Sequence, residues 1–147
     1  MVLFRPMINI KNRILIKMAT LWNKGYVLNQ KIKEYTVGND YLLDKKLVKF
    51  DCLASKAHAR MLHQIGLISN KDLKKILFCL DEIIMLAGKG KFQITRSDED
   101  CHTAIENYLT KKLGDTGKKI HTARSRNDQV LAAVRLWLLD ASRQKRQ

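Results

Sequence analysis

Apolar residues spaced three and four positions apart constrain this chain more than any other feature of its sequence. They recur from Leu43 to Ile65 and again from Leu73 to Ala87, which is the spacing of one face of an α-helix. Gly66 ends the first pattern, and Ser69 opens the second with a Ser-x-x-acid start typical of a helix N-terminus. We therefore predict two helices that pack antiparallel as a hairpin.

The predicted inward faces of these two helices follow directly from the spacing. On the first helix the expected buried residues are Leu43, Leu47, Phe50, Ala54, Ala57, Met61 and Ile65. On the second helix they are Leu73, Ile76, Leu77, Leu80, Ile83, Ile84 and Ala87.

Two further helices are predicted in the second half of the chain. One starts near residues 97–100, where three acids would suit the positive end of a helix dipole, and runs to Leu113. Gly114 and Gly117 then break the chain, and the last helix begins around Asn127 and Asp128, both common N-cap types. The expected inward residues are Ile105, Tyr108, Leu109 and Leu113 on the former and Val130, Val134, Trp137, Leu138 and Ala141 on the latter.

Composition supports a folded, helix-rich protein. The chain is 46% hydrophobic and contains one proline, and no β-hairpin or internal repeat is evident. No apolar run reaches the roughly 18 residues that span a bilayer. The three cysteines are widely spaced and form no CxxC pair, which favours reduced thiols in a cytosolic protein over a disulfide framework or a zinc site.

A formal net charge of +14 suggests nucleic-acid binding, but its distribution argues against that function. Residues 1–17 carry four basic side chains and residues 141–147 carry three, with no acid in either stretch. Elsewhere the lysines are interspersed with acids, and aromatic residues are not interleaved with the basic ones as in a base-stacking surface. Nucleic acid is therefore an unlikely partner.

Within the segment His121–Val130, the six residues Arg124–Gln129 combine two arginines, a hydroxyl, two amides and a carboxylate just before an apolar helix. Helix N-termini present unpaired N–H groups and partial positive charge, and arginine binds planar carboxylates with two hydrogen bonds. This pattern indicates a carboxylate-binding site. The alternative is a helix-capping loop whose charges are solvated.

His102 and Glu106 lie four residues apart and would share a helix face. Such a pair can ligate a metal, but it is more often a surface contact, and no further ligands lie nearby in sequence. No metal site is predicted. His58 and His63 are interpreted as structural or solvent-facing, and His121 as a residue that orients the 121–130 segment.

The 121–130 segment resembles the signature loop of argininosuccinate lyase, His-Thr/Ser-Gly-Arg-Ser-Arg-Asn-Asp-Gln-Val. It differs only at Ala123, where the family has glycine. If this position requires a positive φ, alanine would strain the loop. By this resemblance Ser125, Arg126 and Asn127 would contact the substrate.

The resemblance extends from about Met18 to Leu139. Residues 98–106 are similar to the family's Glu-Asp-Ile/Val-His-Thr/Ser-x-x-Glu segment, which borders the substrate pocket, so His102 and Thr103 are candidate pocket residues. Residues 35–40 are similar to an early segment of certain bacterial members. Asp40 stands where many members have a substrate-contacting serine, and it is included as a candidate substrate contact.

The resemblance implies an all-α fold, the N-terminal helical domain of the fumarate lyase superfamily, truncated at the start of the central helical bundle. Residues 1–17 would be an upstream or disordered extension with translation starting at Met18, residues 18–126 the helical lyase domain, and residues 127–147 the start of a long helix cut short. A non-enzymatic helical interaction module and a basic nucleic-acid-binding helical protein are the alternatives.

The implied reaction is the reversible β-elimination of argininosuccinate to arginine and fumarate, without cofactor or metal, in a cytoplasmic homotetramer. The family's catalytic serine lies on a Gly-Ser-Ser-x-Met-Pro loop, a motif that does not occur in these 147 residues. No catalytic residue is therefore assigned here, and the isolated chain is expected to show no turnover.

Overall fold

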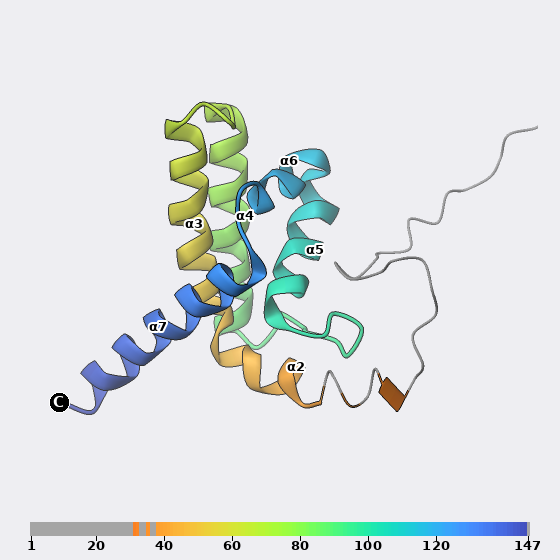
Figure 1. Ribbon diagram of the computed structural model, residues 1–147, viewed down its shortest axis with the longest axis vertical. Coiled ribbons are helices and arrows are strands. Elements are labelled where there is room, and N and C mark those ends of the chain that lie inside the picture. The colour runs from red at the N-terminus through yellow and green to blue at the C-terminus, as the bar shows by residue number, and fades with distance from the viewer. Residues whose placement is uncertain (1–30, 33–34, 36–37, 147) are drawn as a thin grey trace, which may run out of the picture.

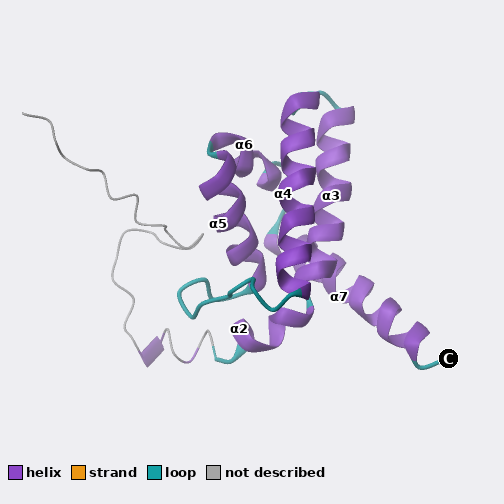
Figure 2. Cartoon of the chain, turned by 180° about the vertical axis from the view of Figure 1, so that it is seen from behind, coloured by secondary structure: helices purple, strands orange, loops and turns teal. Residues whose placement is uncertain are grey.

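The computed structural model describes residues 31–32, 35 and 38–146, and this part of the chain contains helices and loops but no strand (Figures 1 and 2). The predicted all-α class is confirmed. The predicted extension over residues 1–17 and the start at Met18 lie outside the described residues. The elements are α2 (Asp40–Leu43), η1 (Asp44–Lys46), α3 (Val48–Gln64), α4 (Asn70–Gly88), α5 (Cys101–Leu113), α6 (Asp115–Lys118), η2 (Lys119–His121) and α7 (Arg126–Gln144).

Helices α3 and α4 form the predicted hairpin and lie side by side in both ribbon views (Figures 1 and 2). The predicted start of α4 is confirmed, because the Ser69 hydroxyl accepts a 3.0 Å hydrogen bond from the Asp72 N–H. The α4 stripe also faces the core as expected, with Ile76, Leu80 and Ile83 fully buried. The core cluster consists of Val48, Cys52, Ala59, Leu62, Ile68, Ile76, Cys79, Leu80, Ile83, Ile94, Cys101, Ala104, Ile105, Leu109 and Ile120.

The predicted inward face of α3 is only partly correct, since Phe50 is buried and Leu47 is partly buried against the core but other predicted residues are not. Leu43 and Ile65 are 63% and 59% exposed, and the helix begins only at Val48, after the separate turn η1. The face that packs inward carries Val48, Phe50, Asp51, Cys52, Ser55, Ala59 and Leu62. Asp51 and Ser55 are polar, so a pattern built from apolar residues alone missed this face, and buried polar contacts determine which side of α3 faces the core.

Helix α5 begins later than predicted. Asp100 is its N-cap, and the Asp100 carboxylate accepts a 2.7 Å hydrogen bond from the Thr103 N–H. Asp98 instead accepts hydrogen bonds from the N–H and hydroxyl of Thr95, at 2.9 and 2.6 Å, which closes a turn before the helix. Asp98 therefore stabilises the turn that precedes α5, and Asp100 caps the helix, so neither residue lies in its first turn. Ile105 and Leu109 are buried and Tyr108 and Leu113 are partly buried, as predicted.

The predicted break after Leu113 holds two short helical turns, α6 and η2. Gly117 is required there because α6 folds back against α5. A Cβ atom at Gly117 would lie 2.4 Å from the backbone oxygen of Leu109, closer than two such atoms can approach. The chain is thereby held against α5 until it enters the 121–130 segment.

Helix α7 begins at Arg126 with Ser125 as its N-cap, two residues before the predicted caps. Asp128 occupies the third helical position, and together Ser125 and Asp128 form a reciprocal capping box. Only Gln129 and Ala133 of this helix are buried, whereas Leu138, predicted to face inward, is exposed. Helix α7 packs against α3 and then extends away from the other helices (Figure 1).

None of the helices in the described ranges is both long and apolar enough to cross a membrane.

Candidate functional site

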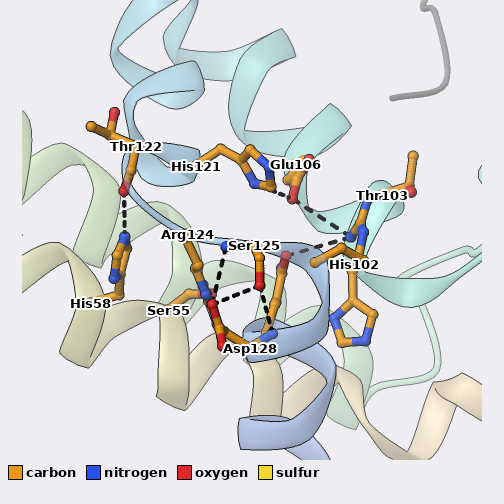
Figure 3. A network of polar contacts seen from close by, with 12 residues as sticks. Ser55, His58, His102, Thr103, Glu106, His121, Thr122, Arg124, Ser125 and Asp128 are labelled. Carbon is orange, nitrogen blue, oxygen red and sulfur yellow. Dashed lines mark hydrogen bonds and ion pairs between the residues drawn. The ribbon is translucent and has the colours of Figure 1, made fainter. Parts of the chain in front are cut away.

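The 121–130 segment leaves η2, turns sharply at Ala123 and enters α7. Ala123 has φ 55°, in the left-handed region, so the condition under which alanine would strain this loop is met. Alanine in this conformation costs about 1–2 kcal/mol relative to its preferred backbone geometry. Contacts with α3 support the turn, because His58 Nε2 lies 3.0 Å from the Thr122 carbonyl oxygen (Figure 3). His58 is therefore structural, as interpreted from the sequence.

Asp51 of α3 lies beneath this segment and is fully buried. Its carboxylate accepts hydrogen bonds from Gln129 Nε2 at 3.0 and 3.3 Å and from the Ser55 hydroxyl at 3.1 Å. His102 Nδ1 lies 2.9 Å from the second carboxylate oxygen, and Arg124 Nη2 lies 3.5 Å from the first. One buried carboxylate thus contacts side chains from α3, α5, α7 and the loop between η2 and α7.

Arg124 is the buried cation of this cluster. Its side chain is 7% exposed, and Nη1 donates a 2.8 Å hydrogen bond to the Ser55 hydroxyl. Burial lowers the pKa of the Arg124 guanidinium, while the nearby carboxylates of Asp51 and Glu106 act in the opposite direction. An arginine remains protonated under these conditions. Its positive charge compensates the buried carboxylate below.

Arg126, the first residue of α7, faces α5. Its Nη2 donates a 3.0 Å hydrogen bond to Thr103 Oγ1, and its Nη1 lies 3.5 Å from Gln129 Oε1. Two carboxylate oxygens lie slightly further away from Arg126 Nη1, that of Glu106 at 3.6 Å and that of Asp100 at 3.7 Å. These separations exceed the roughly 2.7–2.9 Å of a charge-assisted hydrogen bond. The guanidinium therefore retains capacity to bind a further carboxylate.

Glu106 closes this side of the site. Its Oε1 atom is buried without a hydrogen-bond partner in the described part of the chain, although His121 Nδ1 lies 3.2 Å away. Figure 3 shows His121 and Glu106 pointing toward each other. His121 thus contacts a carboxylate of α5 from the start of the segment, in agreement with its interpretation as an orienting residue.

At the N-terminus of α7, the side chains of Ser125 and Asp128 cap the helix. The Ser125 hydroxyl donates a 2.6 Å hydrogen bond to Asp128 and accepts a 3.1 Å one from the Asp128 N–H. The hydrogen bonds with the Ser125 hydroxyl hold the pKa of Asp128 below its ordinary value. The hydrogen bond from the Ser125 N–H to the Asp128 carboxylate lowers this pKa further. Asn127 is exposed beside them. The helix N-terminus adds partial positive charge at this point.

Asp44, Cys101 and His102 each place one potential ligand atom within 4.8 Å of the others. Protein contacts account for this cluster, since Asp44 accepts a 3.2 Å hydrogen bond from the Cys101 N–H and His102 faces Asp51. Burial raises the pKa of the Cys101 thiol, whereas metal coordination requires the thiolate. All three cysteines of the chain are buried and free, and we assign the cluster a structural role.

The structure brings some of the sequence-predicted residues together. Arg126 contacts Thr103 directly, and His102 reaches the same region through Asp51. Ser125 and Asn127 stand at the entrance to α7, but Asp40 is an exposed residue of α2. Among the described residues, no hydrogen bond or ion pair joins Asp40 to the 121–130 segment.

Asp51, Ser55 and Glu106 were not predicted from the sequence as members of this site. Asp51 and Ser55 are separated from the 121–130 segment by about half the chain, and the predicted apolar stripe did not include them. One signal was available, namely that Asp51 and Ser55 lie four positions apart and so share a helix face with the apolar residues Val48, Cys52, Ala59 and Leu62.

Comparison with known proteins identifies close relatives. A family model described as "Lyase" matches residues 17–145. Argininosuccinate lyase of Thermotoga neapolitana is 55% identical over 120 residues, covering 82% of this chain and 30% of that protein. Argininosuccinate lyases of Xanthomonas euvesicatoria and Xylella fastidiosa are each 46% identical over 121 residues, covering 82% of this chain and 28% and 27% of those proteins. The chain thus spans less than a third of the length of these relatives.

Proposed function

Because the chain belongs to this lyase family, in which it corresponds to the N-terminal part of argininosuccinate lyase, we propose that it supplies the carboxylate-binding part of that enzyme's active site. The reaction would be the reversible β-elimination of argininosuccinate to arginine and fumarate. The observation that carries the proposal is the position of Arg126, held by Thr103 with both neighbouring carboxylates beyond hydrogen-bond distance.

The proposed roles follow from the chemistry of the elimination. Removal of a proton beside a carboxylate places extra negative charge on that carboxylate, and fixed donors aimed at it lower the barrier. Arg126, Ser125 and Asn127 would be those donors, assisted by the N-terminus of α7. His102 and Thr103 would form the wall of the pocket on α5. Asp40, exposed on α2, is the least supported of the proposed contacts.

This chain would act together with other segments. None of its residues is proposed as the catalytic base, which in the family is a serine in a motif that this sequence lacks. The outer face of α7 is apolar and solvent-exposed at Leu131, Leu138 and Leu139, as expected for a helix that packs against further helices. We propose a cytoplasmic homotetramer as the functional assembly, requiring no metal or cofactor.

Reassembly from two pieces tests the proposal. The purified chain is mixed with the remainder of the Thermotoga neapolitana argininosuccinate lyase that follows the matched segment, and fumarate release from argininosuccinate is followed. We expect no turnover from either piece alone and clear turnover from the mixture. Arg126→Gln should abolish this activity, whereas Arg60→Gln, an exposed change on α3, should preserve it. An Arg126→Gln mixture as active as the wild type would refute the proposed carboxylate-binding role.

A further inference from the structure

We propose that Asp51 is a positioning residue that aligns both loop arginines and His102 for substrate binding, an inference that rests on the function proposed above. Asp51 is 0% exposed, so we expect any effect on the reaction to pass through the groups that it contacts. Those groups come from α5, from α7 and from the loop that precedes α7.

Two hydrogen-bonded routes lead from Asp51 to the two arginines. Toward Arg124, the Ser55 hydroxyl donates to Asp51 at 3.1 Å and accepts from Arg124 Nη1 at 2.8 Å. Toward Arg126, Gln129 donates to Asp51 through Nε2, and its Oε1 lies 3.5 Å from Arg126 Nη1. The amide of Gln129 is thereby fixed in one orientation, with its oxygen toward the arginine. A single carboxylate is thus linked to both guanidinium groups and acts together with Thr103 in placing that of Arg126.

The third contact fixes the imidazole of His102. An ionised carboxylate can only accept hydrogen bonds, so the 2.9 Å contact places a proton on Nδ1. The neighbouring residue, Thr103, accepts the hydrogen bond from Arg126. Asp51 therefore sets the ring orientation and protonation pattern of one proposed pocket residue while supporting the arginine bound to the next.

The chemistry of the site requires a carboxylate at position 51. Four donor groups converge on its two oxygens, from Ser55, His102, Arg124 and Gln129. An asparagine would turn an NH₂ group toward some of these donors and would leave the Arg124 cation without its buried counter-charge. Asp51→Asn changes no atom that touches the substrate and nearly preserves the shape of the side chain.

The first experiment uses nitrogen-edited NMR on the labelled 147-residue chain without ligand. In the wild type the His102 ring should show the proton on Nδ1 and a single orientation. In Asp51→Asn we expect this signature to be lost while the helical circular dichroism is retained. Asp81→Asn is the matched control, since Asp81 is a surface carboxylate, 59% exposed and paired with Lys56. It should leave the His102 signals unchanged.

The second experiment measures kinetics of the reassembled enzyme. Small misplacements of binding groups cost about 100-fold in rate, so Asp51→Asn should lower kcat/KM about 100-fold, with most of the loss in kcat. Asp81→Asn should match the wild type. Wild-type His102 signals together with wild-type kinetics in Asp51→Asn would overturn the inference.

A third variant covers the case in which Asp51→Asn does not fold. Asp51→Asn with Gln129→Glu returns the negative charge to the cluster but moves it onto α7. If charge compensation alone matters, this double variant recovers both stability and kcat, and the positioning role is wrong. If position matters, it recovers stability without the His102 signature or kcat. An inactive wild-type mixture would instead contradict the function itself, and the ligand-free NMR comparison would still decide whether Asp51 positions His102.

Discussion

Arg126 Nη2 donates a 3.0 Å hydrogen bond to Thr103 Oγ1, so the first residue of α7 is tied directly to the third residue of α5. Thr103 is buried and Arg126 is half-buried. The hydrogen bond therefore lies at the boundary between the core and the solvent-facing mouth of α7. It fixes the guanidinium on which the proposed carboxylate binding depends.

Removing this acceptor should weaken both the fold and the site. Thr103→Val keeps the side-chain shape but leaves an Arg126 donor without its partner, and we expect a loss of about 1–3 kcal/mol in the free energy of unfolding. Urea denaturation followed by circular dichroism measures this. Thr103→Ser retains the hydroxyl and serves as the control. Equal losses in the two variants would show that packing of the methyl group, and not the hydrogen bond, is responsible.

The two serine caps allow the stabilising role of Ser125 to be separated from its proposed contact with substrate. Ser69 caps α4 with the same geometry, accepting from the Asp72 N–H, and no binding role is proposed for it. Ser69→Ala and Ser125→Ala should each cost about 1 kcal/mol in the free energy of unfolding. Only Ser125→Ala should also change the kinetics of the reassembled enzyme. Unaltered kinetics would remove Ser125 from the proposed substrate contacts.

Glycine at position 123 should stabilise the chain. The φ of 55° costs alanine about 1–2 kcal/mol, and the greater freedom of glycine in the unfolded chain offsets part of that gain. We expect Ala123→Gly to raise the free energy of unfolding by about 0.5 kcal/mol. Ala57→Gly, an exposed substitution within α3, should lower it by about 1 kcal/mol. A loss of stability in both variants would contradict the strain assigned to Ala123.

The Asp128 cap gives a defined pH dependence. Its pKa in the folded chain lies below its ordinary value of 3.8, so its stabilising contribution is fully present above that value. The contribution disappears as the pH falls through the lowered pKa. Comparing thermal unfolding of the wild type and Asp128→Asn over a pH series, we expect the difference in stability to narrow below about pH 4. A difference that stays constant to strongly acid pH would show that the ionised carboxylate is not what stabilises the cap.

Helices read from a regular apolar pattern were predicted well where the core is wholly apolar. The α4 stripe around Ile76, Leu80 and Ile83 is buried as expected, because each inward position is filled by a side chain that the core favours. Its start was also predicted, since the Ser69 cap depends only on residues within one turn. The glycine that the resembling family has at position 123 was the one signal in the sequence for the positive φ that Ala123 adopts.

The arrangement of α3 could not be read in the same way. Asp51 and Ser55 point inward because their partners, such as Arg124 and Gln129, arrive from the other half of the chain. A pattern of residues within one helix carries no information about partners so distant in sequence. The apolar pattern therefore assigned the exposed residues Ala57 and Met61 to the core instead. The helix starts at Asp100 and Ser125 were missed by a few residues because several adjacent residues could have served as caps.

The contacts of Asp51 also bear on the order in which the chain folds. They join it to His102 across 51 residues and to Gln129 across 78, while the α3–α4 hairpin needs only a short connection. Closing long loops costs more chain entropy, so contacts distant in sequence form after local ones unless they belong to the folding nucleus. During synthesis Asp51 can therefore pair only with Ser55 of its own helix until α5 and α7 have emerged. We expect the turn at Ala123, which lies above these long-range contacts, to be the last part of this unit to acquire its native geometry.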